Sequence, residues 1–227
     1  MLSEAVHVRV FSANSRSLLQ VVRPAVAALG VLLLPAAGRA VTMPGFDHAI
    51  PLEPQKLEAG GGVAGGDQLI SAFALARLGL LDDLDFALRV GFIGGLKLGT
   101  REDNGFEVQA APRFRFIRTE DTGFVDAAVV ADVSIVKTEG IFVLGLDPTV
   151  VASHHFAIEG RRQLYIALGL GVAFDYYDAD GGPSDLESGI MGSASTGVDV
   201  IEHLRLSLEA RLRDEFERYG LAVTYQF

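Results

Sequence analysis

The feature of this sequence that most constrains its fold is a regular alternation of apolar residues with small or polar ones, repeated in long runs. In the last run, Leu221, Val223, Tyr225 and Phe227 share one face, and small or polar residues fill the other. A period of two residues is that of a β-strand with two unlike faces, because successive side chains point to opposite sides. The same pattern fills residues 84–98, 106–116, 125–135, 164–176 and 204–213.

Weaker forms of the pattern complete a ladder of strands. They lie at residues 55–64, 68–80, 142–152 and 190–200. Turn signals separate the runs, at residues 65–66, 82–83, 100–105, 119–123, 137–140 and 178–187, and around 203 and 214–215. We find no βαβ rhythm and no helical heptads. The sequence therefore predicts an all-β, antiparallel, up-and-down arrangement of about ten strands, with eight as the other possible count.

Strand length and residue size indicate which face points outward. The runs reach roughly 11–15 residues, whereas soluble strands centre near 5–6 and membrane strands need about 9–11. The less apolar face is rich in small residues such as Ala167, Gly169, Gly171 and Ala173, which suit a confined interior better than a face in water. In lipid a sheet must close so that no backbone group stays unpaired. We therefore expect a closed transmembrane β-barrel with its apolar face outward.

Charges on the inward face predict a narrow lumen in which opposite charges pair. Basic and acidic residues are equally frequent there, and buried charges without partners are strongly destabilising. They are Arg77, Arg89, Lys97, Arg113, Arg115, Arg205, Arg211 and Arg213, with Asp85, Glu107, Asp126, Asp132, Asp147, Asp175, Asp199 and Glu209. The other interpretation is that they are ordinary surface charges in water.

The N-terminal residues follow a different pattern. Residues 24–37 form an uncharged apolar stretch after Arg16 and Arg23, and Gly38 and Ala40 occupy the −3 and −1 positions of a cleavage site after residue 40. This is the layout of a secretory signal peptide, and the stretch is too short to span a bilayer. The alternative is a buried helix of a soluble domain.

The signal peptide, the strand ladder and the terminal run together resemble the small outer-membrane β-barrel proteins of Gram-negative bacteria. Phe227 at the end of the chain, with Tyr225 on the same face, is similar to the signal that the barrel-assembly machinery reads in that family. The absence of Trp departs from the family, so Phe and Tyr must form the aromatic girdles. The resemblance implies Sec-type export, residence in the outer membrane among its lipids, and both termini in the periplasm. It does not indicate an oligomeric state. We therefore expect a signal peptide over 1–40, a periplasmic N-terminal tail over 41–54 and a β-barrel domain over 55–227.

Residues that could carry catalysis are few. His48, His154, His155 and His203 fall in the expected tail or in expected periplasmic turns, away from the outer rim, and no Gly-x-Ser-x-Gly motif occurs. Acidic residues at 178–187 miss the spacing of an EF-hand, so we interpret them as a solvated loop. We expect no enzyme activity, no cofactor and no metal.

Composition excludes other classes and leaves two functions open. The net charge is −10 and the sequence pI is near 4.9, which disfavours nucleic-acid binding. A mean hydropathy of +0.32 is high for so acidic a chain, and strands that are apolar on one face account for it. We expect a largely occluded barrel with a structural or surface-interaction role, or limited passage of small solutes. The alternative is a secreted, soluble, lipocalin-like barrel that binds an apolar ligand inside.

Overall fold

The computed structural model describes residues 43–66, 69–98, 101–158, 162–179, 184–213 and 216–227. The predicted signal peptide and its cleavage site lie outside these residues. No helix in the described part of the chain is long and apolar enough to cross a membrane.

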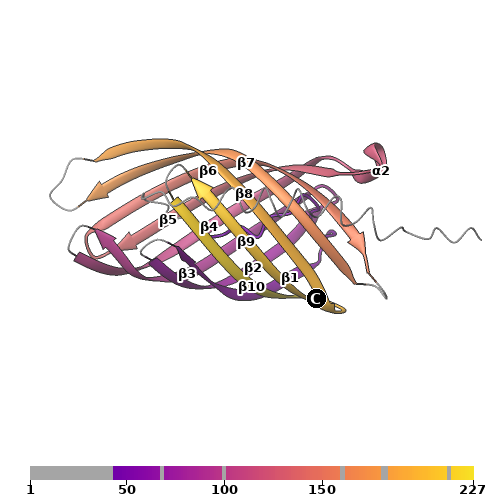
Figure 1. Ribbon diagram of the computed structural model, residues 1–227, viewed down its shortest axis with the longest axis horizontal. Coiled ribbons are helices and arrows are strands. Elements are labelled where there is room, and N and C mark those ends of the chain that lie inside the picture. The colour runs from indigo at the N-terminus through magenta and orange to yellow at the C-terminus, as the bar shows by residue number, and fades with distance from the viewer. Residues whose placement is uncertain (1–42, 67–68, 99–100, 159–161, 180–183, 214–215) are drawn as a thin grey trace, which may run out of the picture. The chain divides into compact units, whose positions relative to one another are not determined.

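Ten strands in the described residues form one closed antiparallel barrel (Figure 1). Each strand pairs with its neighbours in the sequence, and β1 pairs with β10, from Glu58 opposite Gln226 to Gly66 opposite Arg218. The strands are β1 (Leu57–Gly66), β2 (Leu69–Leu81), β3 (Leu84–Leu98), β4 (Arg101–Ile117), β5 (Asp126–Thr138), β6 (Ile141–Ala157), β7 (Gln163–Ala179), β8 (Asp185–Ile201), β9 (Leu204–Arg213) and β10 (Phe216–Gln226). The short helix α2 (Thr119–Thr122) lies between β4 and β5. The predicted fold class and strand count are confirmed.

Two predicted loops lie at least partly in strands. We expected a polar loop at 100–105, but β4 begins at Arg101, and Lys97 and Leu98 of β3 pair with Glu102 and Arg101. Similarly, residues 178–179 and 185–187 of the expected loop at 178–187 belong to the ends of β7 and β8, and residues 180–183 lie outside the described residues. Backbone pairing continues there because it depends on the peptide groups. Polar side chains indicate only that the strand passes into polar surroundings, and not that it ends.

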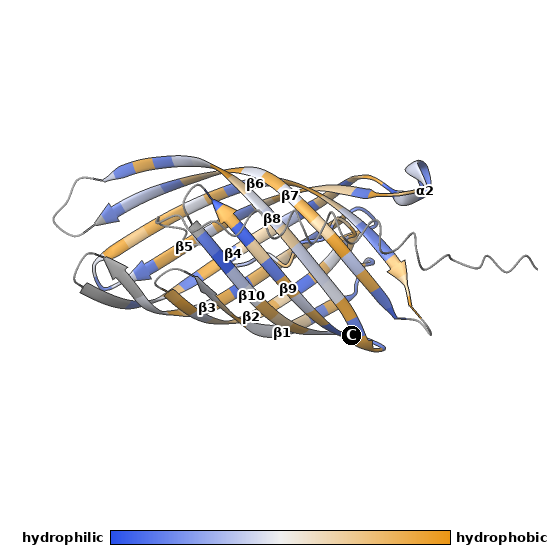
Figure 2. Cartoon of the chain, in the orientation of Figure 1, coloured by the Kyte–Doolittle hydropathy of each residue, from blue (hydrophilic) through white to orange (hydrophobic). Residues whose placement is uncertain are grey.

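The two faces of the barrel have opposite character. Leu168 and Leu170 of β7 are more than half exposed, whereas Arg89 and Glu107 are almost fully buried. Figure 2 shows the same alternation of hydrophobic and hydrophilic residues along several strands. Apolar side chains therefore point outward and charged ones inward, as in a transmembrane barrel. The lipocalin alternative requires the reverse orientation and does not fit.

Substitutions on the outward face can test whether that face lies in lipid. Leu170 is 66% exposed near the middle of β7, and Phe124 is equally exposed between α2 and β5. In lipid vesicles, Leu170→Arg should lower the free energy of unfolding by about 2–4 kcal/mol, and Phe124→Arg by about 0–1 kcal/mol. Denaturant titration measures both. Equal, negligible effects would mean that the outer face lies in water.

The end of the chain closes the barrel. The Phe227 N–H donates to the Leu57 carbonyl (2.8 Å), and the Phe227 ring packs on Tyr225 with centroids 4.9 Å apart.

Recognition of this chain end by the assembly machinery remains a prediction. Deleting Phe227 should reduce the yield of folded barrel in the outer membrane more than Phe92→Ala does, because Phe92 is similarly exposed but lies within β3. Heat-modifiable gel mobility gives the folded yield, and equal yields would contradict the signal.

Candidate functional site in the barrel lumen

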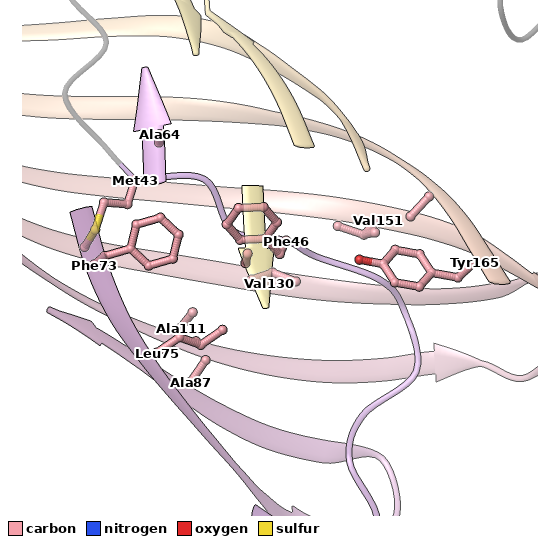
Figure 3. Packing of buried hydrophobic residues seen from close by; sticks show 12 residues of the cluster. Met43, Phe46, Ala64, Phe73, Leu75, Ala87, Ala111, Val130, Val151 and Tyr165 are labelled. Carbon is pink, nitrogen blue, oxygen red and sulfur yellow. The ribbon is translucent and has the colours of Figure 1, made fainter. Parts of the chain in front are cut away.

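Residues 43–56, which we call the lumen segment, precede β1, and residues 43–52 of this segment run through the interior of the barrel (Figure 3). Met43 and Ala49 are fully buried, and Asp47 is 4% exposed. We expected residues 41–54 to form a periplasmic N-terminal tail, yet residues 43–52 contact the barrel wall from inside. The candidate site is therefore the interface between the lumen segment and the wall.

Proline explains why the lumen segment stays out of the sheet. Pro44, Pro51 and Pro54 lack an N–H group and cannot complete a strand ladder. Residues 43–52 of the segment are almost all buried, so their other peptide groups need hydrogen-bond partners from elsewhere. Side chains of the wall supply them.

Acidic and hydroxyl side chains of the wall accept hydrogen bonds from N–H groups of the segment. Carboxylates serve well here, because each oxygen accepts more than one hydrogen bond and none donates. The pairs are Met43 with Glu107 (2.6 Å), Gly45 (3.0 Å) and Phe46 with Glu209, Ala49 with Ser153 (3.0 Å), and Leu52 with Asp85 (2.8 Å).

Donors on the wall bind the oxygen atoms of the segment. Arginine supplies most of them, because its guanidinium group carries five N–H donors and no acceptor. The pairs are Arg77 with the Ile50 carbonyl (2.8 Å), Arg89 with the Gly45 carbonyl (2.6 Å), Arg113 with the Asp47 carboxylate (2.7 Å) and Ser195 with the Asp47 carbonyl (2.5 Å). The wall and the segment therefore complete each other's hydrogen bonding.

The hydrogen bonds that His48 receives from arginine side chains keep its ring neutral. Its Nε2 atom lies 3.0 Å from Arg77 Nη1 and 3.3 Å from Arg205 Nη1. Arginine can only donate, so Nε2 must accept, and the ring proton lies on Nδ1. The His48 ring also packs against Tyr165 and His155, with centroids 4.8 and 5.4 Å away. We expected this histidine in the tail, but it lies in the lumen.

His154 and His155 lie within β6 and not in a turn as expected. They point to opposite faces, as adjacent strand residues must: His154 stacks on the exposed Phe124, and His155 faces the lumen. His155 Nε2 is 3.4 Å from Ser153 Oγ, a residue pair that hydrolases use. Ser153 is 1% exposed and already accepts the Ala49 N–H, so this pair has no room for a substrate beside the lumen segment.

Ion pairs connect most of the inward charges that the sequence singled out. Some of them join neighbouring strands, one lies within β9, and others join strands that are not neighbours in the barrel. The pairs are Arg77–Asp85 (2.5 Å), Arg89–Asp132 (3.1 Å), Arg211–Asp132 (3.3 Å), Arg211–Glu209 (3.1 Å), Arg205–Asp199 (2.8 Å), Arg115–Asp126 (3.4 Å) and Arg213–Asp175. Lys97 lies in β3, but its side chain is outside the described part of the structure.

Three charges outside the predicted inward set belong with it: Arg218, Glu58 and Asp47 of the lumen segment. Arg218 faces Glu107 at 3.7 Å, and Glu58 and Asp47 are buried. Asp147, which the sequence did single out, is 1% exposed, and both of its carboxylate oxygens lack a hydrogen-bond partner among the described residues. Among the described residues, no group of three or more His, Asp or Glu side chains is arranged to hold a metal ion.

A separate ion-pair cluster lies at the rim, in the turn between β2 and β3. Asp83 accepts hydrogen bonds from Arg118 Nε (3.0 Å) and Arg115 Nε (2.9 Å). The hydrogen bond from Arg118 lowers the pKa of the Asp83 carboxyl below its ordinary value, burial opposes this, and the Arg115 hydrogen bond lowers the pKa further. This turn therefore keeps its negative charge and ties β2–β3 to the end of β4.

Apolar contacts seat the lumen segment between strands. Figure 3 shows Met43 and Phe46 beside Phe73, and the rings of Phe46 and Phe73 have centroids 5.7 Å apart. Gly220 on β10 makes room for the segment, because a Cβ atom there falls 2.7 Å from both Phe46 Cζ and Pro44 Cγ. A cavity of about 10 Å³ remains beside the segment, roughly what one water molecule needs.

Gly220 tests how closely the lumen segment packs. Gly220→Ala should lower the free energy of unfolding by about 1–3 kcal/mol, because the new methyl group collides with the segment. Gly192→Ala is the matched control, since its Cβ has only the Gly169 carbonyl oxygen at 4.0 Å nearby, and its effect should stay within about 0.5 kcal/mol. Denaturant titration in detergent compares them, and equal stabilities would contradict the packed segment.

Comparison with known proteins finds solved structures of low similarity and no match among families or curated proteins. No protein-family model matches the sequence, and no curated protein matches it either. Among solved structures, the KdgM porin has 11% identity and a TM-score of 0.36, over 75% of this chain and 99% of the porin chain. The N-terminal β-barrel domain of Pseudomonas aeruginosa OprF has 14% identity and a TM-score of 0.36, over 78% of this chain and 100% of that domain.

Ail, the attachment invasion locus protein of Yersinia pestis, has 13% identity and a TM-score of 0.30, over 78% of this chain and 100% of Ail. At these identities and TM-scores we take nothing about function from the three structures. The molecule's own geometry is more informative, because a closed antiparallel ladder, long strands and an outward apolar face occur together. The chain thus has the architecture of a small outer-membrane β-barrel protein.

Proposed function

We propose that this chain is an outer-membrane barrel whose lumen is closed by its own N-terminal residues, and that small solutes pass only when the lumen segment moves. In the closed state its role is structural or surface-interacting. The observation that carries this proposal is the set of hydrogen bonds between the lumen segment and both acids and arginines of the wall. The small residual cavity supports it, since a hydrated solute needs far more space.

The interface between the lumen segment and the wall is polar, which allows the segment to leave the lumen. The carboxylates and guanidinium groups that hold the lumen segment can bind water once it departs, so the open lumen is not an apolar void. An eight-stranded barrel is filled by side chains alone, and open porins need 16–18 strands. Ten strands leave space for about one extended chain, which supports slow passage of small solutes over free diffusion.

Planar-bilayer recording tests the closure. The chain from residue 41 onward should show no large, stable conductance, and a variant lacking residues 43–54 should show discrete channel openings. A large, stable conductance of the intact chain would overturn the closed lumen. A folded but silent deletion variant would overturn solute passage.

A reversible crosslink gives the same test without deleting residues. The chain has no cysteine, so Ala49→Cys with Ser153→Cys introduces a single pair, where the Ala49 nitrogen lies 3.0 Å from Ser153 Oγ. The oxidised protein should be silent, and reduction should allow brief openings. Identical open-channel currents in both states would show that the lumen segment does not close the barrel.

A further inference from the structure

Four arginines meet in the part of the lumen that the lumen segment crosses. Three of them have a carboxylate partner on the wall, and these pairs are Arg77–Asp85, Arg89–Asp132 and Arg211–Glu209. The fourth, Arg113 of β4, is 2% exposed, and among the described residues its one paired carboxylate is Asp47 of the segment. On the wall, Asp85 lies opposite Arg113 in the β3–β4 register but is already paired with Arg77, so the ion pair of Arg113 depends on the lumen segment.

Three guanidinium groups converge on the Asp47 carboxylate. Arg113 Nη2 donates to Oδ1 at 2.7 Å, and Arg89 and Arg211 lie 3.7 and 3.6 Å from the same carboxylate. Arg113 also has unused donors, because its Nε and Nη1 atoms lack hydrogen-bond partners in the described structure. A guanidinium group cannot discharge by losing its proton, so when Asp47 leaves, this site needs another anion.

Departure of the lumen segment also frees two hydrogen-bond donors that are now bonded to uncharged carbonyl oxygens. Arg89 Nη2 donates to the Gly45 carbonyl at 2.6 Å, and Ser195 Oγ donates to the Asp47 carbonyl at 2.5 Å. The vacated site thus offers a bidentate position for a carboxylate, with further donors beside it for hydroxyl or carbonyl oxygens.

We propose that Arg113, with Arg89 and Arg211, forms a binding site for small carboxylate solutes, and that Asp47 occupies this site as a built-in competitor. This inference rests on the proposed function, because a solute reaches the site only when the lumen segment moves. It names the solute class as small organic anions that carry a carboxylate.

Chemical rescue tests the site in the full chain. Asp47→Ala leaves a carboxylate-sized space among the three arginines, which formate can fill. At constant ionic strength, replacing chloride by formate should raise the thermal midpoint of Asp47→Ala, read by heat-modifiable gel mobility, by at least about 2 °C. The unmodified protein should not respond.

Two variants control for a general salt effect. Glu53→Ala removes an exposed carboxylate from the same segment and should show no response to formate. Asp47→Ala combined with Arg113→Gln should lose the response. If Asp47→Ala fails to fold in chloride, refolding yield becomes the readout: recovery in formate supports the site, and failure in both salts overturns it. A formate response that survives Arg113→Gln, or no response of folded Asp47→Ala, also overturns it.

Ion selectivity separates this inference from the proposed function. The variant lacking residues 43–54 should prefer anions in a salt gradient, and adding Arg113→Gln should lower its permeability ratio for formate over potassium. Channel openings without that effect would overturn the carboxylate site and leave the gated barrel standing. Formate rescue of Asp47→Ala in a protein that never conducts would overturn solute passage and leave the binding site standing.

Discussion

The whole arrangement depends on the requirement that charges buried in the lumen have partners. A guanidinium or carboxylate group taken out of water destabilises the barrel by several kcal/mol unless an opposite charge or hydrogen bonds compensate. The wall supplies ion pairs for Arg77, Arg89 and Arg211, whereas Arg113, opposite the already paired Asp85, forms its ion pair with Asp47 of the lumen segment. The lumen segment is thus part of the charge balance of the barrel as well as an obstruction in it.

Strand number explains why a segment is needed at all. Eight strands enclose an interior that side chains fill, and two more widen it. Many inward positions of this wall carry small residues, such as Ala87, Ala111, Ala167 and Ala222, which leave space along the axis. One extended chain fills that space, and its prolines keep it from pairing with the strands.

The sequence predicted the strands and their two faces well but the contents of the lumen poorly, for a physical reason. Alternation is a local signal, so the strands, their faces and the inward positions of Arg89, Glu107 and Arg113 could be inferred from neighbours two residues away. The lumen segment has no period, and its partners lie far off: Met43 binds Glu107 and Gly45 binds Glu209, which are 64 and 164 positions away. Phe46, Ile50 and Leu52, apolar residues in a supposed tail, were the available hint that this stretch is buried.

The chemistry of the interface determines whether the closed state can be left. An apolar plug in an apolar lumen leaves dry surfaces behind when it moves, and those surfaces strongly favour its return. Here Glu209 accepts two N–H groups of the segment while it pairs with Arg211, and water can replace the segment at both oxygens. Arg113 is the exception, because its partner is a full charge and water is a weak substitute for it. Closure is therefore held by many replaceable hydrogen bonds and by the ion pairs of a single carboxylate, Asp47, whose replacement requires another anion. An anion is thus the kind of molecule to which opening can respond.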